Sequence, residues 1–305
     1  MIEACFSEQY AANTRTPSMR KLQLVAQAVS SQGFVRLVEP STMDIATRLR
    51  RLHDPRYVDA FIAGNQPLAN SQGWQWTPSI RDGVLAINAG QLCAAELALE
   101  HGIAANIAQG FHHAGHARGC GYCTFNGLAL VAQENPGRRI FVLDCDEHEG
   151  NGTCEFTKRM DNLRQATIFG SNFGGEDTPR SVQFQLDAVT DNWPAYEEAL
   201  TSAFALIKAW RPDLVIYQAG ADPHIDDPCG LLAMTTRQLL MRDRMVFDHM
   251  LGAGIPVLFV LAGGYQKMEP LVQLHVNTFR AAQAAVQSLR LKRKGKGSPA
   301  LDQAR

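Results

Sequence analysis

Apolar residues recur along this chain in two alternating patterns. Short continuous apolar runs at residues 103–107, 139–143, 214–217 and 255–261 predict buried strands. Longer segments with helical spacing, at residues 86–101, 196–210 and 236–251, predict helices, the first of which ends at Gly102, a residue type favoured at helix ends. Strands of continuous apolar character separated by helices are typical of a parallel sheet covered on both faces. The pattern therefore predicts a doubly wound α/β fold.

One change of composition stands out, at the C-terminal end of the chain. Residues 289–305 read LRLKRKGKGSPALDQAR, which is basic and then polar, with no continuing apolar period. Such a segment buries too little apolar surface to order itself. We therefore expect a single folded domain over residues 1–290 and a basic, disordered tail over residues 291–305.

Composition and charge narrow the class of protein. The 29 Lys and Arg residues against 30 Asp and Glu residues give a formal net charge of −1, which argues against a dedicated nucleic-acid binder. The longest apolar run, residues 255–262, falls short of the about 18 residues that a membrane helix needs, and the first residues do not resemble a signal peptide. Seven cysteines, an odd number, suit reduced thiols. We expect a cytoplasmic protein that contacts neither nucleic acid nor membrane.

Candidate ligands for a metal follow two of the predicted strands, where a doubly wound sheet binds its ligands. Asp144, Asp146 and His148 come directly after one strand, and on an extended segment they would point the same way. Asp222 follows another strand. If Asp222 joins Asp146 and His148, three protein ligands and one open position result, which is typical of a catalytic zinc, although a carboxylate-rich set also suits other divalent metals.

Two further clusters follow the remaining predicted strands. Adjacent His112 and His113 follow one strand, and Tyr265 follows two glycines after the last strand. His112 and His116 have the i, i+4 spacing of a zinc-protease helix. However, position 113 lacks the glutamate of that motif and Gly115 disfavours a helix, so we reject that interpretation.

Five motifs occur in order along the chain: GFHHA, GYCTFN, DCDEHEGNGT, QAGADP and LAGGYQ. Together they resemble the histone deacetylase and acetylpolyamine amidohydrolase superfamily, and among its branches the bacterial, class IV-like deacetylases. The resemblance covers about residues 5–285. It implies an α/β domain of the arginase–deacetylase type. It also implies zinc-dependent removal of an acyl group, with acetyl as the first expectation, from an N-acylated amine such as acyl-lysine or an acylpolyamine.

The resemblance also implies roles for individual residues. The positions that match the catalytic groups of the family are His112, His113, Tyr265, Asp144 and Asn151. The positions that match its zinc ligands are Asp146, His148 and Asp222. The positions that match its substrate tunnel are Gly121 and Tyr122. Within this set, Asp144 would orient His112, Asn151 would partner His113, and Tyr265 would polarise the scissile carbonyl.

The chain departs from the family's pattern at several positions. Glu149 stands where a second histidine commonly follows the metal ligand. Gly170-Ser171-Asn172 replaces the common Ser-Leu-His, which leaves the monovalent-cation site of the family open. No aspartate near Gln75 and Trp76 matches the rim residue that grips a peptide backbone. We therefore expect a small acylated amine to be cleaved about as well as a longer peptide.

Two other classes of function remain as alternatives. A ureohydrolase of the same broad fold would want a two-metal carboxylate site, and the tandem histidines with Tyr265 argue against it. A non-catalytic binding module would use the basic tail, and the presence of every expected catalytic residue argues against that. Metal content and a panel of acylated substrates would separate the three. An oligomer is compatible with the sequence.

Overall fold

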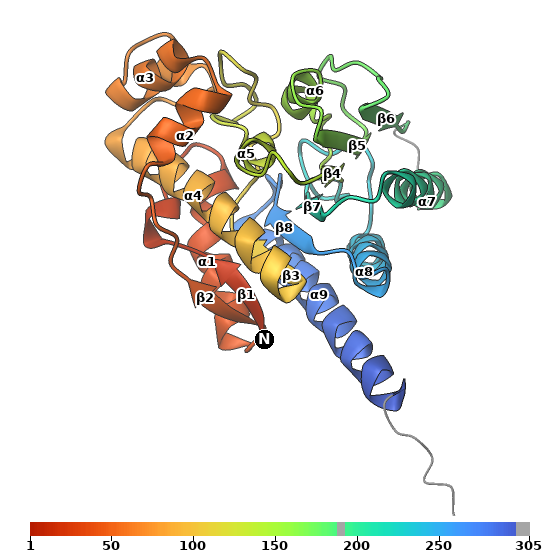
Figure 1. Ribbon diagram of the computed structural model, residues 1–305. Coiled ribbons are helices and arrows are strands. Elements are labelled where there is room, and N and C mark those ends of the chain that lie inside the picture. The colour runs from red at the N-terminus through yellow and green to blue at the C-terminus, as the bar shows by residue number, and fades with distance from the viewer. Residues whose placement is uncertain (188–192, 297–305) are drawn as a thin grey trace, which may run out of the picture.

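The computed structural model describes residues 1–187 and 193–296. In this part of the chain eight strands form one sheet, in which every pairing is parallel and the order is β2-β1-β3-β8-β7-β4-β5-β6 (Figure 1). The strands are β1 (Ile2–Cys5), β2 (Val35–Val38), β3 (Ile103–Asn106), β4 (Ile140–Asp144), β5 (Leu163–Phe169), β6 (Ser181–Gln185), β7 (Leu214–Ala219) and β8 (Val257–Leu261). β3 and β4 are consecutive along the chain but are separated by β8 and β7 in the sheet. Such a change of strand order leaves a crevice at the carboxyl edge, where ligands bind.

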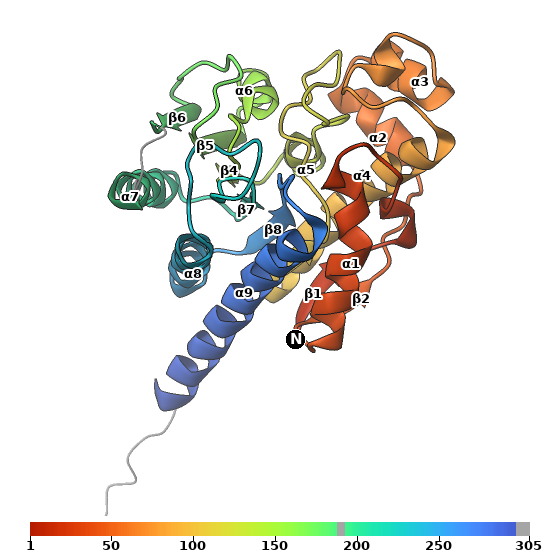
Figure 2. The same ribbon diagram turned by 180° about the vertical axis from the view of Figure 1, so that it is seen from behind.

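Helices cover both faces of the sheet. Figure 1 shows α4 in front of it, and Figure 2 shows α1 and α9 on the opposite side. The helices of the described residues are α1 (Pro17–Ser31), α2 (Ile45–Leu52), α3 (Pro55–Ala63), α4 (Pro78–His101), α5 (Gly127–Glu134), α6 (Asn151–Thr157), α7 (Trp193–Trp210), α8 (Thr236–Gly252) and α9 (Met268–Lys296).

The apolar residues of each strand are divided between two cores, one on each face. In β4, Phe141 and Leu143 belong to the core under α7, α8 and α9, whereas Ile140 and Val142 belong to the core under α2, α3, α4 and α5. Alternate side chains of a strand point to opposite faces, so a sheet covered on both faces needs apolar residues at every position. This explains why the central strands are continuous apolar runs.

Local signals in the sequence fix the ends of the longest helices. The Thr77 side chain accepts the N–H of Ile80 at the start of α4, and Gly102 ends that helix with a positive φ of 84°. Thr235 and Gln238 form a reciprocal capping box at the start of α8. Side-chain acceptors satisfy N–H groups that have no partner within a helix, and glycine adopts positive φ without a Cβ penalty.

Much of the predicted order of elements is confirmed. The four predicted strands correspond to β3, β4, β7 and β8, and the three predicted helices correspond to α4, α7 and α8. At the C-terminal end, α9 continues to Lys296, past residue 291 where the tail was expected to begin, and residues 297–305 of that predicted tail lie outside the described residues. All seven cysteines are free thiols. Among the described helices, none combines the length and the apolar character of a membrane span. The cytoplasmic location stays a prediction.

Candidate active site

The loops after β3, β4, β7 and β8 bring the predicted site residues together at the carboxyl edge of the sheet. These four strands are neighbours in the order β3-β8-β7-β4, so residues far apart in the sequence leave the sheet side by side. A small cavity of about 20 Å³ lies at this edge, and its lining includes His112, Asp146, Tyr122 and Tyr265.

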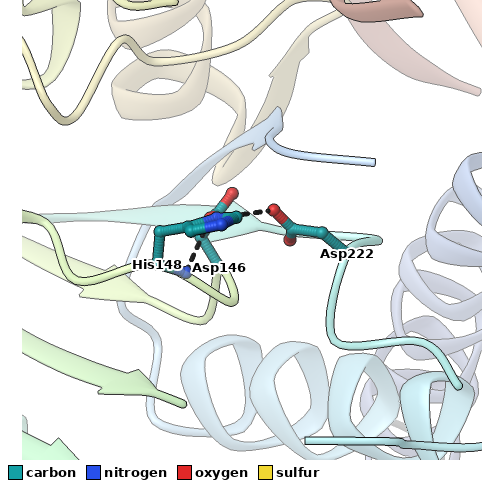
Figure 3. Close-up of side chains that lie close together, drawn as sticks. All are labelled: Asp146, His148 and Asp222. Carbon is teal, nitrogen blue, oxygen red and sulfur yellow. Dashed lines mark hydrogen bonds and ion pairs between the residues drawn. The ribbon is translucent and has the colours of Figure 1, made fainter. Parts of the chain in front are cut away.

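Asp146, His148 and Asp222 form a candidate metal site (Figure 3). One potential ligand atom from each residue lies within 4.8 Å of those from the other two. His148 Nδ1 lies 3.2 Å from Asp146 Oδ1 and 3.1 Å from Asp222 Oδ2, so the imidazole sits between the two carboxylates. The sequence grouped Asp144 with these residues on one face. In the structure Asp144 lies outside the three-residue group and contacts His112 instead.

The electrostatics of these three residues fit a bound cation. Burial raises the pKa of Asp222 to about 6, and the nearby Asp146 charge adds to this increase. Burial alone would lower the pKa of His148, but its hydrogen bonds to Asp146 and Asp222 raise it to about 11. The positive charge beside the two buried carboxylates is therefore not enough to compensate both of them. A divalent cation with carboxylate and imidazole ligands would supply the missing charge. The donor set fits a divalent metal.

The tandem histidines have different partners. His112 Nδ1 lies 2.8 Å from Asp144 Oδ2, and His113 Nδ1 lies 2.8 Å from Asn151 Oδ1. Burial would lower the pKa of His112, but the charges of Asp144 and Asp146 raise it above its usual value. Burial and the neighbouring His112 hold the pKa of His113 well below its usual range. One imidazole therefore favours the charged form and the other the neutral form.

Tyr265 lies on the loop between β8 and α9. Its ring centre is 6.2 Å from that of His148, and burial raises the pKa of its hydroxyl well above the usual value. Asp227 Oδ2 accepts the backbone N–H of Tyr265 at 2.6 Å and that of Gln266 at 3.3 Å. The carboxylate of Asp227 therefore fixes the backbone that carries the phenol.

A buried lysine also binds the backbone of this loop. Lys21, on α1, is 1% exposed and donates from Nζ to the carbonyl of Ala262 at 2.6 Å and to that of Gly263 at 3.3 Å. Burial lowers the pKa of Lys21 to about 8, against the opposing effect of the Asp222 and Asp146 charges. Sequence reasoning missed Lys21 and Asp227, because a lysine on an amphipathic helix and an aspartate before a proline usually face solvent.

Aromatic side chains border the site. The predicted tunnel residue Tyr122 has its ring centre 6.1 Å from that of Tyr265 and stacks on Trp74 at 5.8 Å. Gly121 has a positive φ of 51°, and a Cβ at this position would overlap the ring of His113. Phe173 stacks on His113, with the ring centres 4.2 Å apart. These contacts place Gly121 and Tyr122 beside the catalytic candidates.

Comparisons with known proteins identify the family of the chain. A family model described as the histone deacetylase domain matches residues 15–280. An uncharacterised protein of Picosynechococcus sp. is 33% identical over 276 residues, which are 87% of this chain and 91% of that protein. The chain belongs to the histone deacetylase family.

Named relatives cover less of the chain. Histone deacetylase 2 of Arabidopsis thaliana is 33% identical over 58% of this chain and 48% of its own length. Acetylpolyamine amidohydrolase 1 of Pseudomonas aeruginosa is 28% identical over 50% of this chain and 48% of its own length. The matches thus span about half the length of these two relatives.

A solved structure supports the fold class. The crystal structure of an acetylpolyamine aminohydrolase from Burkholderia pseudomallei superposes with a TM-score of 0.80, at 18% identity, over 93% of this chain and 99% of that chain. The fold is therefore the arginase–deacetylase type of α/β domain that the sequence motifs implied. The family match also favours a deacetylase over the ureohydrolase and binding-module alternatives.

Proposed function

We propose that this protein is a zinc-dependent amidohydrolase that removes a small acyl group from an N-acylated amine, and that acetyl is its preferred acyl group. One observation carries the proposal. Three potential metal ligands lie together beside a histidine pair with two different partners, and Asp146, His112 and Tyr265 from this group line one small cavity.

Asp146, His148 and Asp222 would hold the metal. A divalent cation there supplies Lewis-acid chemistry, which polarises an acyl carbonyl and lowers the pKa of a water. Two carboxylates and an imidazole are ligands that zinc accepts in catalytic sites. The N–H of Gly263 donates to Asp146 Oδ2 at 2.7 Å, and that of Glu147 donates to Asp222 Oδ1 at 3.1 Å. These bonds orient both carboxylates.

His113 is suited to move the proton. Its Nδ1–H donates to Oδ1 of Asn151 at 2.8 Å, which leaves the lone pair on Nε2. Because burial keeps the pKa of His113 low, the imidazole is neutral at neutral pH and can accept a proton from the attacking water. The same Nε2 can then return the proton to the leaving amine.

His112 and Tyr265 are suited to stabilise negative charge. Asp144 holds His112 Nδ1 and favours the imidazolium form, which places a positive charge beside the reacting carbonyl. The raised pKa of Tyr265 keeps its hydroxyl protonated, so it can donate a hydrogen bond to the oxyanion that develops.

The cavity supports a small acyl group. Its volume of about 20 Å³ is only slightly more than the 10–15 Å³ or so that one water needs. Gln109 and Gln218 line it with buried amide groups, and both amides include atoms that have no partner within the described chain. A cavity this small suits an acetyl group better than a long acyl chain.

The amine carrier is open between acyl-lysine and an acylpolyamine. Glu176, an acidic residue of the loop after β5, pairs with Lys158 at 2.7 Å. Its charge is therefore partly neutralised, and it offers a cationic polyamine little attraction. We base the proposal on the acyl-amine arm that both carriers share.

A substrate panel on metal-loaded protein tests the proposal. We expect hydrolysis of acetyl-lysine amide, an acetyl-lysine peptide and an acetylpolyamine, and kcat/KM at least about 10-fold lower for butyryl-lysine amide. A chelator should abolish turnover, and added zinc should restore it. Full activity of metal-free protein, or no cleavage of any acetylated substrate, would refute the proposal. A preference for the peptide above about 100-fold, or about 2.7 kcal/mol, would show that the rim binds peptide backbone.

A further inference from the structure

Glu149 follows the metal-ligand candidate His148, yet its carboxylate turns into the protein and is fully buried. Oε2 accepts the backbone N–H of Phe173 and that of Gly175, both at 2.9 Å. The N–H of Glu149 donates to the carbonyl of Ser171 at 2.9 Å. The turn that carries His148 is therefore joined to the loop after β5 by three hydrogen bonds from one residue.

The loop is shaped around this carboxylate. Two backbone N–H groups, two residues apart, converge on one oxygen, an arrangement that proteins use to bind anions. A Cβ at Gly175 would overlap Glu149 Oε1, so only glycine allows this approach. Gly174 has a positive φ of 85°, and its N–H donates to Asn172 Oδ1 at 2.7 Å.

The segment held by Glu149 carries an aromatic wall of the site. The Phe173 ring lies nearly parallel to the His113 ring, with an interplanar angle of 18° and ring centres 4.2 Å apart. It also meets His148 edge-on, with the ring centres 5.3 Å apart. Phe173 is 39% exposed, so burial in the core does little to fix its position. Its backbone hydrogen bond to Glu149 therefore matters for where the ring lies.

Glu149 is also linked to Asn151, the hydrogen-bond partner of His113. The N–H of Asn151 donates to the carbonyl of Glu149 at 2.8 Å, and Asn151 Oδ1 in turn binds His113 Nδ1. The same short turn thus positions the hydrogen-bond partner of His113 and, through the loop, the ring that stacks on it.

We propose that Glu149 is a positioning residue that holds Phe173 against His113, and so sets the orientation of that imidazole. The inference rests on the proposed function, in which His113 moves the proton. Small displacements of a positioned group cost up to about 100-fold in rate, so loss of this contact should lower turnover without removing a reacting group.

Hydrogen exchange in the metal-loaded, full-length protein tests the contact without any need for turnover. Glu149→Ala should speed exchange in a peptide spanning residues 170–176 by at least about 10-fold, because Phe173 and Gly175 lose their acceptor. Glu149→Gln should preserve protection, because its amide oxygen can still accept. Lys158→Ala is the matched control, since it removes an ion pair from the exposed part of the same loop. Unchanged exchange in Glu149→Ala would overturn the inference.

Kinetics with acetyl-lysine amide test whether Glu149 acts through Phe173. Glu149→Ala and Phe173→Ala should each lower kcat/KM by about 10- to 100-fold, and the double variant should be no worse than Phe173→Ala alone. Additive losses would show that Glu149 does not act through the ring and would overturn the inference.

A second variant covers the case in which Glu149→Ala does not fold. Gly175→Ala places a methyl group where Glu149 Oε1 lies, so it breaks the same contact from the loop and should reproduce both effects. Wild-type protein that hydrolyses no acylated substrate would refute the proposed function, while the exchange experiment would still decide the role of Glu149.

Discussion

The two ends of the sheet differ in the size of the cavity that lies there and in how far their charged side chains are buried. At the amino ends of β1, β3 and β8 lies a cavity of about 500 Å³, lined by residues such as Ile103, Pro256 and Leu289. The cavity at the carboxyl ends is about 20 Å³. At the amino end, the Glu3 carboxylate pairs with Arg36 and with His101, and the latter two side chains are 64% and 44% exposed. These charges remain near water.

The carboxyl end places its charges away from water. The side chains of His112, Asp144, Asp146 and Asp222 are each at most 5% exposed. Burying ionised groups costs free energy unless they are paired, so a protein retains such a cluster where it has a function. Buried charge with insufficient compensation is therefore the feature that distinguishes the candidate site from the amino-end cavity, and cavity volume is not.

A histidine-to-alanine substitution made at each end of the sheet should produce the largest difference in metal content and turnover. His148→Ala removes one of the three proposed metal ligands at the carboxyl end, and we expect loss of bound metal and a fall in turnover of more than about 10³-fold. His101→Ala, at the amino-end cavity, should retain metal and activity. Metal analysis and kcat/KM for acetyl-lysine amide measure both. Equal losses in the two variants would remove the distinction between the ends.

Tyr265→Phe separates chemistry from packing within the carboxyl end. The ring stays and only the hydroxyl is lost, so metal content should remain at the wild-type level while kcat falls by about 10²- to 10³-fold. Metal analysis and initial rates check this prediction. Unchanged kcat would make Tyr265 a packing residue.

Acid sensitivity should also originate near the carboxyl end. His53 is 1% exposed; its Nδ1 lies 2.9 Å from the carbonyl of Gly115, and its Nε2 accepts the N–H of Asn126 at 3.1 Å. Burial lowers the pKa of His53 to about 4, whereas in the unfolded chain it lies near 6.5. Between these values the unfolded chain binds a proton that the folded protein does not. Stability is therefore full above about pH 6.5 and falls as the pH drops toward 4, by about 3 kcal/mol in total.

Denaturant unfolding at pH 7 and pH 4.5 measures this contribution. His53→Gln cannot titrate, so its free energy of unfolding should change less between the two pH values than that of the wild type. His101→Gln, at the exposed amino end, should retain the wild-type dependence. A wild-type slope in His53→Gln would assign the acid sensitivity to other groups.

The smallest effect should come from the C-terminal segment beyond the amino-end cavity. Deleting residues 291–305 removes a basic, polar stretch that begins with Leu291, which is 70% exposed. We expect melting temperature and turnover of small substrates to stay near those of the full chain. Calorimetry and kcat/KM check this, and a large loss of either would show that the segment docks on the domain.

The same division between buried and exposed surface explains what the sequence could predict of the fold. β3, β4, β7 and β8 lie in the middle of the sheet and are continuous apolar runs, so they could be predicted. β2 and β6 lie at the edges and are partly exposed, and β5 contains Arg164 and Gln165. Their mixed patterns resemble those of loops, and only pairing with neighbouring strands makes them part of the sheet.

The sequence could predict those site residues that come directly after a strand. Asp146, His148 and Asp222 come together because β4 and β7 are adjacent, which the doubly wound pattern allows one to expect. Lys21 could not be predicted, because its role depends on how α1 packs against a loop 241 residues later. Contacts of that kind are properties of the folded topology rather than of any local pattern.

The contact of Lys21 also bears on the timing of biosynthesis. At synthesis rates of about 5 to 20 residues per second, the 241 residues between Lys21 and Ala262 take about 12 to 48 s to produce. During that interval α1 can exist, but the carbonyl groups that accept from its lysine have not been made. Asp146 and His148 likewise precede Asp222, so a nascent chain that meets a metal ion early offers an incomplete ligand set. The order of the sequence thus delays completion of the proposed ligand set until most of the sheet has been synthesised.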